Sequence, residues 1–235
     1  MQLKKKKIRF YELDFYKSDN SFVPTGTSEL LVQSASKFVK QNKKILDFGC
    51  GIGVVGITIF KKNKIKSNLY ASDISKSSIK LSKLNAINHK VKIIAKVGNL
   101  FDPWKSEKFD IILNDVSGIS QKVAEVSPWF KNTSCATGED GTALTIKIIS
   151  TAKKYLNKNG AIIFPVLSLS DKKKIVKYAK SNFKNVKKIG FKTWPMPEEF
   201  NKHRKLLDEL KKNNSIDFNE RFGILTFTTE IYYAK

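Results

Sequence analysis

Residues 47–53 read Asp47-Phe48-Gly49-Cys50-Gly51-Ile52-Gly53, and they begin at the end of the apolar run 44–48. Glycine stands at every second position of this segment, and glycine tolerates tight turns and a close approach of the backbone to another molecule. A glycine-rich turn that follows a strand and precedes a helix is typical of sites that hold a ligand against the main chain. The segment therefore predicts a strand–turn–helix unit with a ligand at the turn.

On both sides of this unit, short apolar runs alternate with segments of helical length. The apolar runs are 44–48, 68–72, 91–95, 109–114, 160–166, 186–191 and 223–233. The predicted helices include Ser75–Asn88, Thr142–Asn157, Asp171–Ser181 and Pro197–Asn214. Strand–helix alternation of this kind indicates a mainly parallel sheet with helices on both faces. We predict an α/β fold with a doubly wound, mainly parallel, seven-stranded, Rossmann-like sheet.

The amino-terminal part differs from this pattern. Ile8–Phe22 alternates loosely and contains the turn signal Ser18-Asp19-Asn20, which predicts a hairpin. A helix is expected to begin at Thr27. The sequence therefore predicts an extension over residues 1–26 and one ligand-binding domain over residues 27–235.

Composition is that of an ordinary globular domain, with 41% hydrophobic and 28% charged residues among 235. No apolar run approaches the roughly 20 residues that cross a bilayer, and no signal peptide is recognised, so we expect a cytoplasmic protein without a membrane partner. The two cysteines, Cys50 and Cys135, have no metal-ligand spacing, so no metal is expected. Cys50 is interpreted as a small spacer between glycines rather than a reactive thiol.

The net charge of +23 has two interpretations. A basic excess is typical of proteins that bind nucleic acid. However, the chain has 41 lysines against 3 arginines, a skew that indicates AT-rich coding, because arginine is the better partner for phosphate. RNA binding and coding bias both stay open, and no oligomeric state is predicted.

Polar residues follow the second, third and fourth predicted strands. They are Asp73 after the second, Asn99 beside the apolar Leu100 after the third, and Asn114 with Asp115 after the fourth. Carboxyl ends of parallel strands meet at one edge of a doubly wound sheet, where ligands bind. Asp73 is suited to accept hydrogen bonds from two ribose hydroxyls, and Asn99 and Leu100 to hold the edge and face of an adenine.

Residues 51–56 also match the dinucleotide fingerprint Gly-x-Gly-x-x-Gly. In that fingerprint the strand runs directly into the first glycine, whereas residues 47–50 intervene here. The carboxylate of Asp47 is poorly suited to a pyrophosphate and well suited to the ammonium of a methionine moiety. We therefore favour S-adenosylmethionine over a nicotinamide or flavin cofactor.

These residues resemble the motifs of class I methyltransferases, in the "small domain" branch. That branch includes the HemK-type protein-glutamine methyltransferases and several ribosomal RNA guanine methyltransferases. The resemblance covers roughly residues 23–170. The segments that carry it are 23–32, 47–53, 71–75, 85–86 and 138–141.

The resemblance implies a Rossmann-like fold, methyl transfer and S-adenosyl-L-methionine as the cofactor. It implies that the glycines line the methionine and the ribose, that the acid after the second strand binds the ribose, and that Leu100 lies near the adenine. The cofactor-binding residues are then Asp47, Gly49, Gly51, Gly53, Asp73, Ile74, Asn99, Leu100 and Asn114.

In HemK-type enzymes the fourth strand ends in Asn-Pro-Pro-Tyr, where asparagine accepts hydrogen bonds from the target nitrogen. Here the same place reads Asn114-Asp115-Val116-Ser117. Asn114 is predicted to be one catalytic acceptor and Asp115 a second, charged one, because positive charge develops on the nitrogen during transfer. The alternative is that Asn114 and Asp115 only open a loop.

Three functions remain open. We favour methylation of a nitrogen in a macromolecular partner, either a protein side chain or an RNA base. The alternatives are a small-molecule methyltransferase and a non-catalytic module that only binds S-adenosylmethionine. Trp104, Trp129 and Phe130 could stack on a flat substrate group or pack in the core, and His89 and His203 are predicted at the surface.

Overall fold

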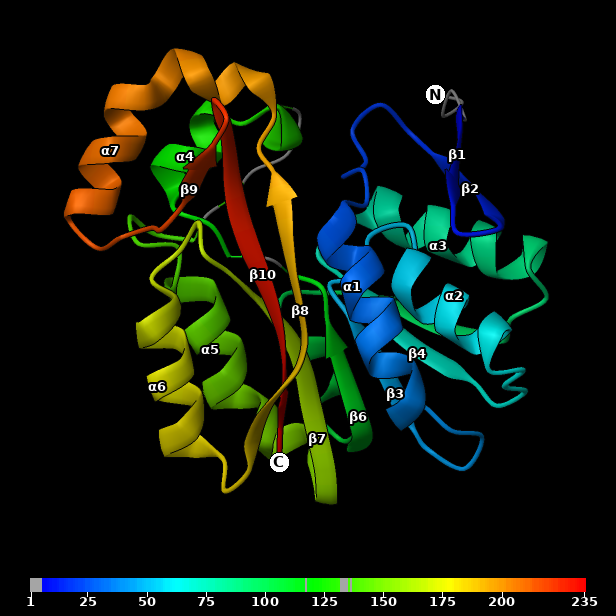
Figure 1. Cartoon of the computed structure of the whole chain (residues 1–235). Coiled ribbons are helices and arrows are strands. Elements are labelled where there is room, and N and C mark those ends of the chain that lie inside the picture. The colour runs from blue at the N-terminus through cyan, green and yellow to red at the C-terminus, as the bar shows by residue number, and fades with distance from the viewer. Residues whose placement is uncertain (1–5, 117, 132–134, 136) are drawn as a thin grey trace.

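The computed structural model describes residues 6–116, 118–131, 135 and 137–235. Within them, the main sheet has eight strands, seven of which follow the order β5-β4-β3-β6-β7-β10-β8, while short β9 pairs with β10 (Figure 1). In sheet order the strands are β5 (Ile93–Val97), β4 (Leu69–Asp73), β3 (Ile45–Phe48), β6 (Phe109–Asn114), β7 (Leu156–Leu167), β10 (Ile224–Ala234) and β8 (Val186–Pro195), with β9 at Asn219–Arg221.

The first five strands of this order are parallel, and β10 is antiparallel to both of its long neighbours. Each of the seven predicted apolar runs overlaps one of these strands, so the doubly wound, mainly parallel fold is confirmed. Phe48 at the end of β3 pairs with Ser72 of β4 and with Asn114 of β6. The carboxyl ends of these three strands therefore lie side by side.

Helices cover both faces of the sheet (Figure 1). One face carries α1 (Gly26–Ala35), α2 (Val54–Lys62) and α3 (Lys76–Asn88), and the other carries α5 (Ala143–Ala152) and α6 (Lys172–Asn182). Side chains of β3 alternate between the two layers: Ile45 belongs to the apolar core under α2, and Leu46 to the core under α5. Burying a side chain of this size stabilises the fold by about 1.5–3 kcal/mol. No helix among the described residues is both long and apolar enough to span a membrane.

The helices begin where capping residues stand. The side chain of Ser75 accepts a hydrogen bond from Ser78 N at the start of α3, and Asp171 accepts one from Lys174 N at the start of α6. Both starts agree with the predicted helices. α1 begins at Gly26, one residue before the expected Thr27.

Two predicted helices have wrong boundaries. The helix expected over Thr142–Asn157 ends at Ala152 and continues as the 3-10 helix η4 (Lys153–Tyr155), because Leu156 already pairs with Phe109 in the sheet. The helix expected over Pro197–Asn214 is divided into the 3-10 helix η5 (Glu198–His203) and α7 (Arg204–Lys212).

The amino-terminal hairpin is present as β1 (Lys6–Phe10) and β2 (Leu13–Lys17). It turns at Tyr11, whose φ is +54°, and not at Ser18–Asn20, which lies after β2. Phe15 is fully buried in the same core as α1 and α3. The hairpin therefore contributes to the core of the domain, and the division at residue 26 stays a prediction.

A third apolar core lies beyond the carboxyl ends of the strands. It joins α4 (Gln121–Val126) to η5, α7 and the upper end of β10, with Phe200 and Leu207 fully buried (Figure 1). The remaining 3-10 helices are η1 (Ser36–Phe38), η2 (Asp102–Trp104) and η3 (Pro128–Phe130).

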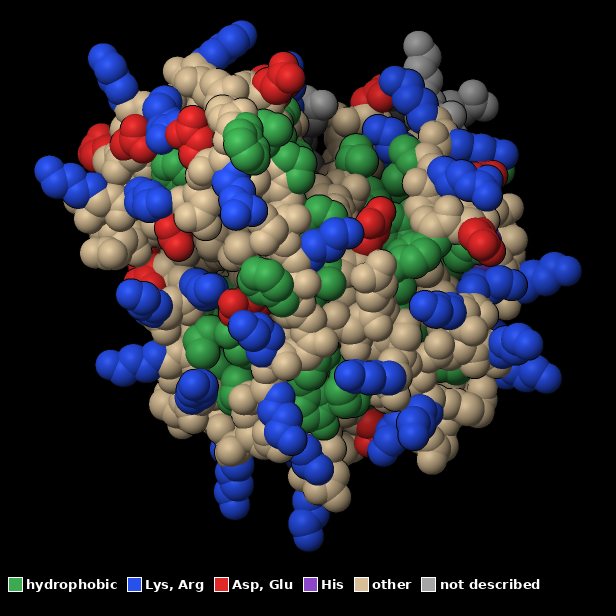
Figure 2. Space-filling view, in the orientation of Figure 1, with side chains coloured by type: hydrophobic (Ala, Val, Ile, Leu, Met, Phe, Trp, Pro, Cys, Tyr) green, Lys and Arg blue, Asp and Glu red, His purple; other side chains and the backbone are tan. Residues whose placement is uncertain are grey.

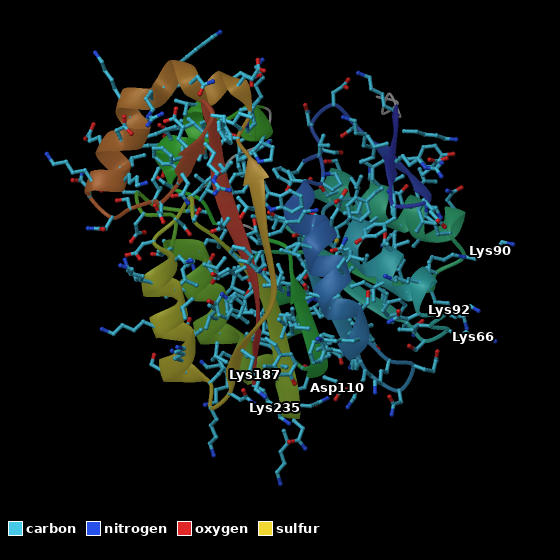
Figure 3. The ribbon with its side chains drawn as sticks, viewed as in Figure 1. Lys66, Lys90, Lys92, Asp110, Lys187 and Lys235 are labelled. Carbon is cyan, nitrogen blue, oxygen red and sulfur yellow. The ribbon has the colours of Figure 1, made fainter. Side chains whose placement is uncertain are left out.

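The opposite, amino-terminal edge of the sheet is held by Asp110. Its carboxylate accepts hydrogen bonds from Lys44 N at 2.8 Å and from Asn157 Nδ2 at 3.0 Å, which join the starts of β3, β6 and β7. In Figure 3, Lys187 and Lys235 are labelled near Asp110 at the lower end of the molecule, whereas Lys66, Lys90 and Lys92 are labelled on the right-hand side.

Candidate functional site

The glycine segment forms a tight turn between β3 and α2. Gly49, Gly51 and Gly53 all have positive φ, at +65°, +51° and +88°. A Cβ at Gly49 would lie 2.1 Å from Val116 Cγ2, so this position has no room for a side chain. A Cβ at Gly51 would meet no atom within 4 Å, because Gly51 faces open space. The turn therefore exposes its backbone to a cavity, as the sequence predicts.

Asp73 ends β4 and is fixed against this turn. Its Oδ2 accepts a hydrogen bond from Gly51 N at 2.9 Å, and its Oδ1 accepts one from Ser75 N at 2.8 Å. Burial raises the pKa of Asp73, and these two hydrogen bonds oppose the rise. Each carboxylate oxygen retains a lone pair, so Asp73 can accept further hydrogen bonds from a ligand.

A cavity of about 580 Å³ lies over the carboxyl ends of β3, β4, β5 and β6. Seven of the ten predicted site residues line it. They are Gly49, Gly51, Asp73, Ile74, Asn99, Leu100 and Asp115. The other three, Asp47, Gly53 and Asn114, do not.

The cavity wall next to Asp73 is apolar. Ile74 is 73% exposed, which is high for a large aliphatic side chain, and Leu100 has a φ of +47°. Asn99 also lines the cavity and offers an amide. A carboxylate beside an apolar surface and an amide is suited to a nucleoside, because the ribose needs acceptors while the base needs flat contact and one polar partner.

Asp47 points away from the cavity. Its carboxylate is fully buried, and Oδ2 accepts a hydrogen bond from Gly56 N in α2 at 3.0 Å, while Oδ1 has no partner in the described structure. Burial raises the pKa of Asp47 to about 7, and nearby Asp115 contributes to the rise. This placement differs from the predicted contact with an ammonium group, because alternation along β3 directs Asp47 towards α2.

Asn114 and Asp115 have different environments. Asn114 is 1% exposed, and its amide faces the next residues: Oδ1 accepts from Val116 N at 3.3 Å, and Nδ2 donates to Val116 O at 3.5 Å. Asp115 lines the cavity, and its Oδ2 accepts a hydrogen bond from Ser28 Oγ at 2.7 Å. Burial raises the pKa of Asp115 to about 7. The structure therefore brings Asp115, rather than Asn114, to the cavity, and Ser117 lies outside the described residues.

Several lining residues were not identified from the sequence. They are Asn20, Phe22, Pro24, Ser28, Cys135, Thr137, Leu144 and Ile148, among others. The resemblance of residues 23–32 to a HemK-type segment was the one signal that pointed to part of this group. The contact of Ser28 with Asp115 spans 87 positions, so no local pattern indicates it.

The other candidates have structural surroundings. Trp104 is fully buried between Tyr70 and Phe109, so it packs in the core. Trp129 packs against Phe200, and Phe130 lines the cavity. His89 and His203 are half-buried rather than fully exposed, and Cys50 is a buried thiol whose pKa burial raises, which agrees with its interpretation as a spacer. Within the described ranges, no group of three or more His, Cys, Asp or Glu side chains is arranged to hold a metal ion.

The order of the parallel strands, the glycine turn after β3 and the acid at the end of β4 define the class I methyltransferase fold. Residues 23–116 match the family model described as "Methyltransferase small domain". This part of the chain is therefore similar to the methyltransferase small domain, in agreement with the motifs.

Two similar curated relatives share one name. The release factor glutamine methyltransferase of Clostridium acetobutylicum is 28% identical over 171 residues, which cover 68% of this chain and 60% of the relative. That of Aquifex aeolicus is 29% identical over 152 residues, covering 61% and 54%. The chain thus spans little more than half the length of these relatives.

Solved structures share the fold. The tRNA m1G37 methyltransferase of M. jannaschii has a TM-score of 0.60 at 13% identity and covers all of this chain and 58% of its own. The ribosomal protein L11 methylase of Lactobacillus delbrueckii subsp. bulgaricus has a TM-score of 0.52 at 16% identity, covering 89% of this chain and 80% of its own. At these identities the likeness shows the fold alone.

Proposed function

We propose that this protein binds S-adenosyl-L-methionine in the 580 Å³ cavity and transfers its methyl group to a nitrogen of a macromolecule. One observation carries the proposal: the same cavity has the Asp73–Gly51 pair on one wall and the Asp115 carboxylate on another. A nucleoside-binding wall and a separate hydrogen-bond acceptor are the two parts that nitrogen methylation requires.

The residues present fit the cofactor. Gly51 has no side chain and opens onto the cavity, Asp73 keeps free lone pairs for ribose hydroxyls, and Ile74 and Leu100 offer an apolar surface to the base. When bound, the cofactor supplies an electrophilic methyl group. The protein itself holds the methyl donor and the acceptor nitrogen in line, because transfer of a methyl group from one to the other depends mainly on their alignment.

Asp115 is the acceptor that this geometry offers to the target nitrogen. The hydroxyl of Ser28 fixes its Oδ2, which leaves Oδ1 to accept a hydrogen bond from an N–H of the substrate. A carboxylate stabilises the positive charge that develops on the nitrogen more strongly than an amide does. The backbone of Val116 already engages the amide of Asn114, so we assign Asn114 the role of fixing the loop that carries Asp115.

The names of the relatives support a macromolecular substrate. The curated relatives are named for a release factor, and the two solved structures for a transfer RNA and a ribosomal protein. The open cavity beside Asp115 supports transfer over cofactor binding alone, since a module that only binds would have no need of an accessible acceptor there.

The proposal is tested in two steps. Calorimetry should show binding of S-adenosylmethionine or S-adenosylhomocysteine, without competition from nicotinamide cofactors. Labelled S-adenosylmethionine is then offered with the protein to a cell extract that is separated into protein, RNA and small molecules. Label in protein or RNA supports the proposal. Label in small molecules alone would identify a small-molecule methyltransferase instead. If the protein binds the cofactor but transfers no methyl group, it is a non-catalytic binding module.

A further inference from the structure

Lysines are concentrated at the amino-terminal end of the sheet, opposite to the 580 Å³ cavity. Seven stretches of chain meet at this end, because six of them lead into strands that run in the same direction and residue 235 follows β10, which is antiparallel to its neighbours. Together we call these stretches the lysine end. They are residues 40–44, 61–68, 89–92, 105–110, 153–158, 180–188 and 235.

The rest of the chain does not share the charge of the lysine end. The 39 residues of this end contain 19 lysines and two acids, whereas the remaining 196 residues contain 25 basic and 19 acidic ones. Seventeen of the 19 lysines are exposed, and Lys43 and Lys44 are half-buried. AT-rich coding raises the lysine content along the whole chain and does not remove acids from one end, so coding bias does not explain this separation of charge.

Few carboxylates neutralise the lysine end. Glu107 pairs with Lys44, and the carboxylate of Asp110 accepts the backbone N–H of Lys44 at 2.8 Å. Lys188 pairs with Glu230 of β10 at 3.2 Å. Within the part of the chain that the structure describes, the other 17 lysines of this end form no ion pair. Like charges repel, so a partner that supplies the missing negative charge stabilises this surface.

We propose that the lysine end binds the phosphate backbone of a nucleic acid. The nucleic acid is a docking partner and not the methyl acceptor, because the lysine end and the cavity lie at opposite ends of the same strands. The inference is independent of the proposed function, since it holds whichever molecule receives the methyl group.

The composition of the lysine end indicates contact with phosphates. A nucleic acid carries a negative charge at every nucleotide, so its backbone can neutralise lysines across the width of about 30 Å that seven strands span. The three arginines of the chain, Arg9, Arg204 and Arg221, all lie outside this end. Lysine acts as a point charge, whereas the planar fork of arginine is suited to more specific recognition. We therefore expect binding that depends on salt and not on the nucleotide sequence.

The shape of the lysine end favours a nucleic acid over a membrane. Neighbouring strands of a sheet are rotated by about 20–25°, so the directions of β5 and β8 differ by more than about 100° and the strand starts face different sides. Figure 3 agrees, with Lys187 and Lys235 at the lower end of the molecule and Lys66, Lys90 and Lys92 on the right-hand side. In Figure 2, blue side chains project from both of these margins, whereas red and blue ones are interspersed over the lobe of α7. A nucleic acid chain can follow such a curved surface, while a flat bilayer contacts only part of it.

Three fourfold variants with the same change in net charge test the proposal. Each replaces four exposed lysines that form no ion pair in the described structure. The first changes the turn before β4, with Lys61→Gln, Lys62→Gln, Lys64→Gln and Lys66→Gln. The second changes the ends of β8 and β10, with Lys180→Gln, Lys184→Gln, Lys187→Gln and Lys235→Gln. The control changes the opposite end of the molecule, with Lys122→Gln, Lys173→Gln, Lys205→Gln and Lys212→Gln.

The assay is a fluorescence anisotropy titration with a labelled single strand of about 20 nucleotides, made once as RNA and once as DNA, from about 50 to about 300 mM salt. Each of the first two variants should lose at least about tenfold in affinity near 50 mM salt, and the slope of log affinity against log salt should become shallower by about two to three, since each lost lysine contact removes about 0.7. The control should stay within about twofold of the wild type, and RNA and DNA should bind within about threefold of each other. An unchanged urea midpoint for each variant shows that it is folded.

Other results overturn the inference. An equal loss in the control would show that the net charge of the chain binds the oligonucleotide, without a site at the lysine end. Tighter binding of phosphatidylcholine–phosphatidylserine vesicles or of polyglutamate than of either oligonucleotide would replace nucleic acid as the partner. A preference of more than about tenfold between RNA and DNA would assign the contact to the sugar or the bases instead of the phosphates. Binding that Asp115→Asn abolishes and the lysine variants do not would place the oligonucleotide in the cavity as a substrate.

Discussion

Replacing Ser28 by alanine should move the pH dependence of methyl transfer to higher pH. Ser28 Oγ donates to Asp115 Oδ2 at 2.7 Å, and this bond stabilises the ionised carboxylate. Burial raises the pKa of Asp115 to about 7, and the hydrogen bond from Ser28 opposes this rise. Without the hydroxyl, the pKa of Asp115 rises further, so a higher pH is needed to ionise the acceptor.

The size of the effect follows from the hydrogen bond. A hydrogen bond to a charged group contributes about 1.5–3 kcal/mol, and 1.36 kcal/mol corresponds to one pH unit. Partial exposure of Asp115 weakens the bond, so we expect the midpoint to move up by about one pH unit. Near pH 6.5 the Ser28→Ala variant should therefore turn over up to about tenfold more slowly than the wild type, with most of the deficit recovered near pH 9.

The assay is the initial rate of transfer at saturating cofactor, from about pH 5.5 to about pH 9.5. Ser34→Ala is the matched control, because it removes a buried hydroxyl from the same helix without lining the cavity. Asp115→Asn should lose the pH dependence and reduce turnover by about 10²-fold, as when one preorganised group is removed. The reasoning is refuted if the midpoint is the same in Ser28→Ala as in the wild type, or if it persists in Asp115→Asn.

Three further predictions concern binding and stability. Asp73→Ala should weaken binding of S-adenosylhomocysteine by about 1–3 kcal/mol in calorimetry, and unchanged affinity would remove Asp73 from the ribose site. Gly49→Ala places a Cβ 2.1 Å from Val116 Cγ2 at a φ of +65°, so it should lower the free energy of unfolding in urea by about 2–3 kcal/mol, with partial recovery when Val116→Ala is added. The free energy of unfolding should fall as pH rises from about 4 to about 7, because burial raises the pKa of Asp47 and Asp115 to about 7 and the folded state retains protons that the unfolded state has released. Asp47→Asn should flatten that decline, and an equally steep decline in this variant would contradict the assignment.

The alternation of apolar runs with helical segments along the chain was sufficient to predict the main sheet. The central strands β3 and β6 bury side chains on both faces, which produces the continuous apolar runs that mark a parallel sheet. The strand β9 was missed because its three residues, Asn219–Arg221, are exposed and polar and pair only with β10. The break between η5 and α7 was missed because both segments share one helical pattern of apolar residues.

The site could be predicted where position along the sheet determines it. Asp73 and Asn99 follow neighbouring parallel strands, so their meeting at one edge follows from the fold. Successive side chains alternate across a strand, and this alternation decides whether Asn114 or Asp115 faces the cavity. The sequence does not reveal the absolute direction of that alternation. The contact of Ser28 with Asp115 depends on how α1 packs against the sheet. No residue spacing in the sequence indicates this packing.

The position of β10 between β7 and β8 determines the sequence in which the sheet can be completed during translation. β8 is made before β10, yet its pairing partner in the sheet is β10. Until residues 224–234 leave the ribosome, β7 has an open backbone edge and β8 has no strand to join. Open strand edges template association between chains, so the interval between the synthesis of β7 and that of β10 is when a nascent chain is most exposed to aggregation. A chain truncated at residue 223 would retain the Asp73 and Asp115 walls of the site and keep this open edge permanently.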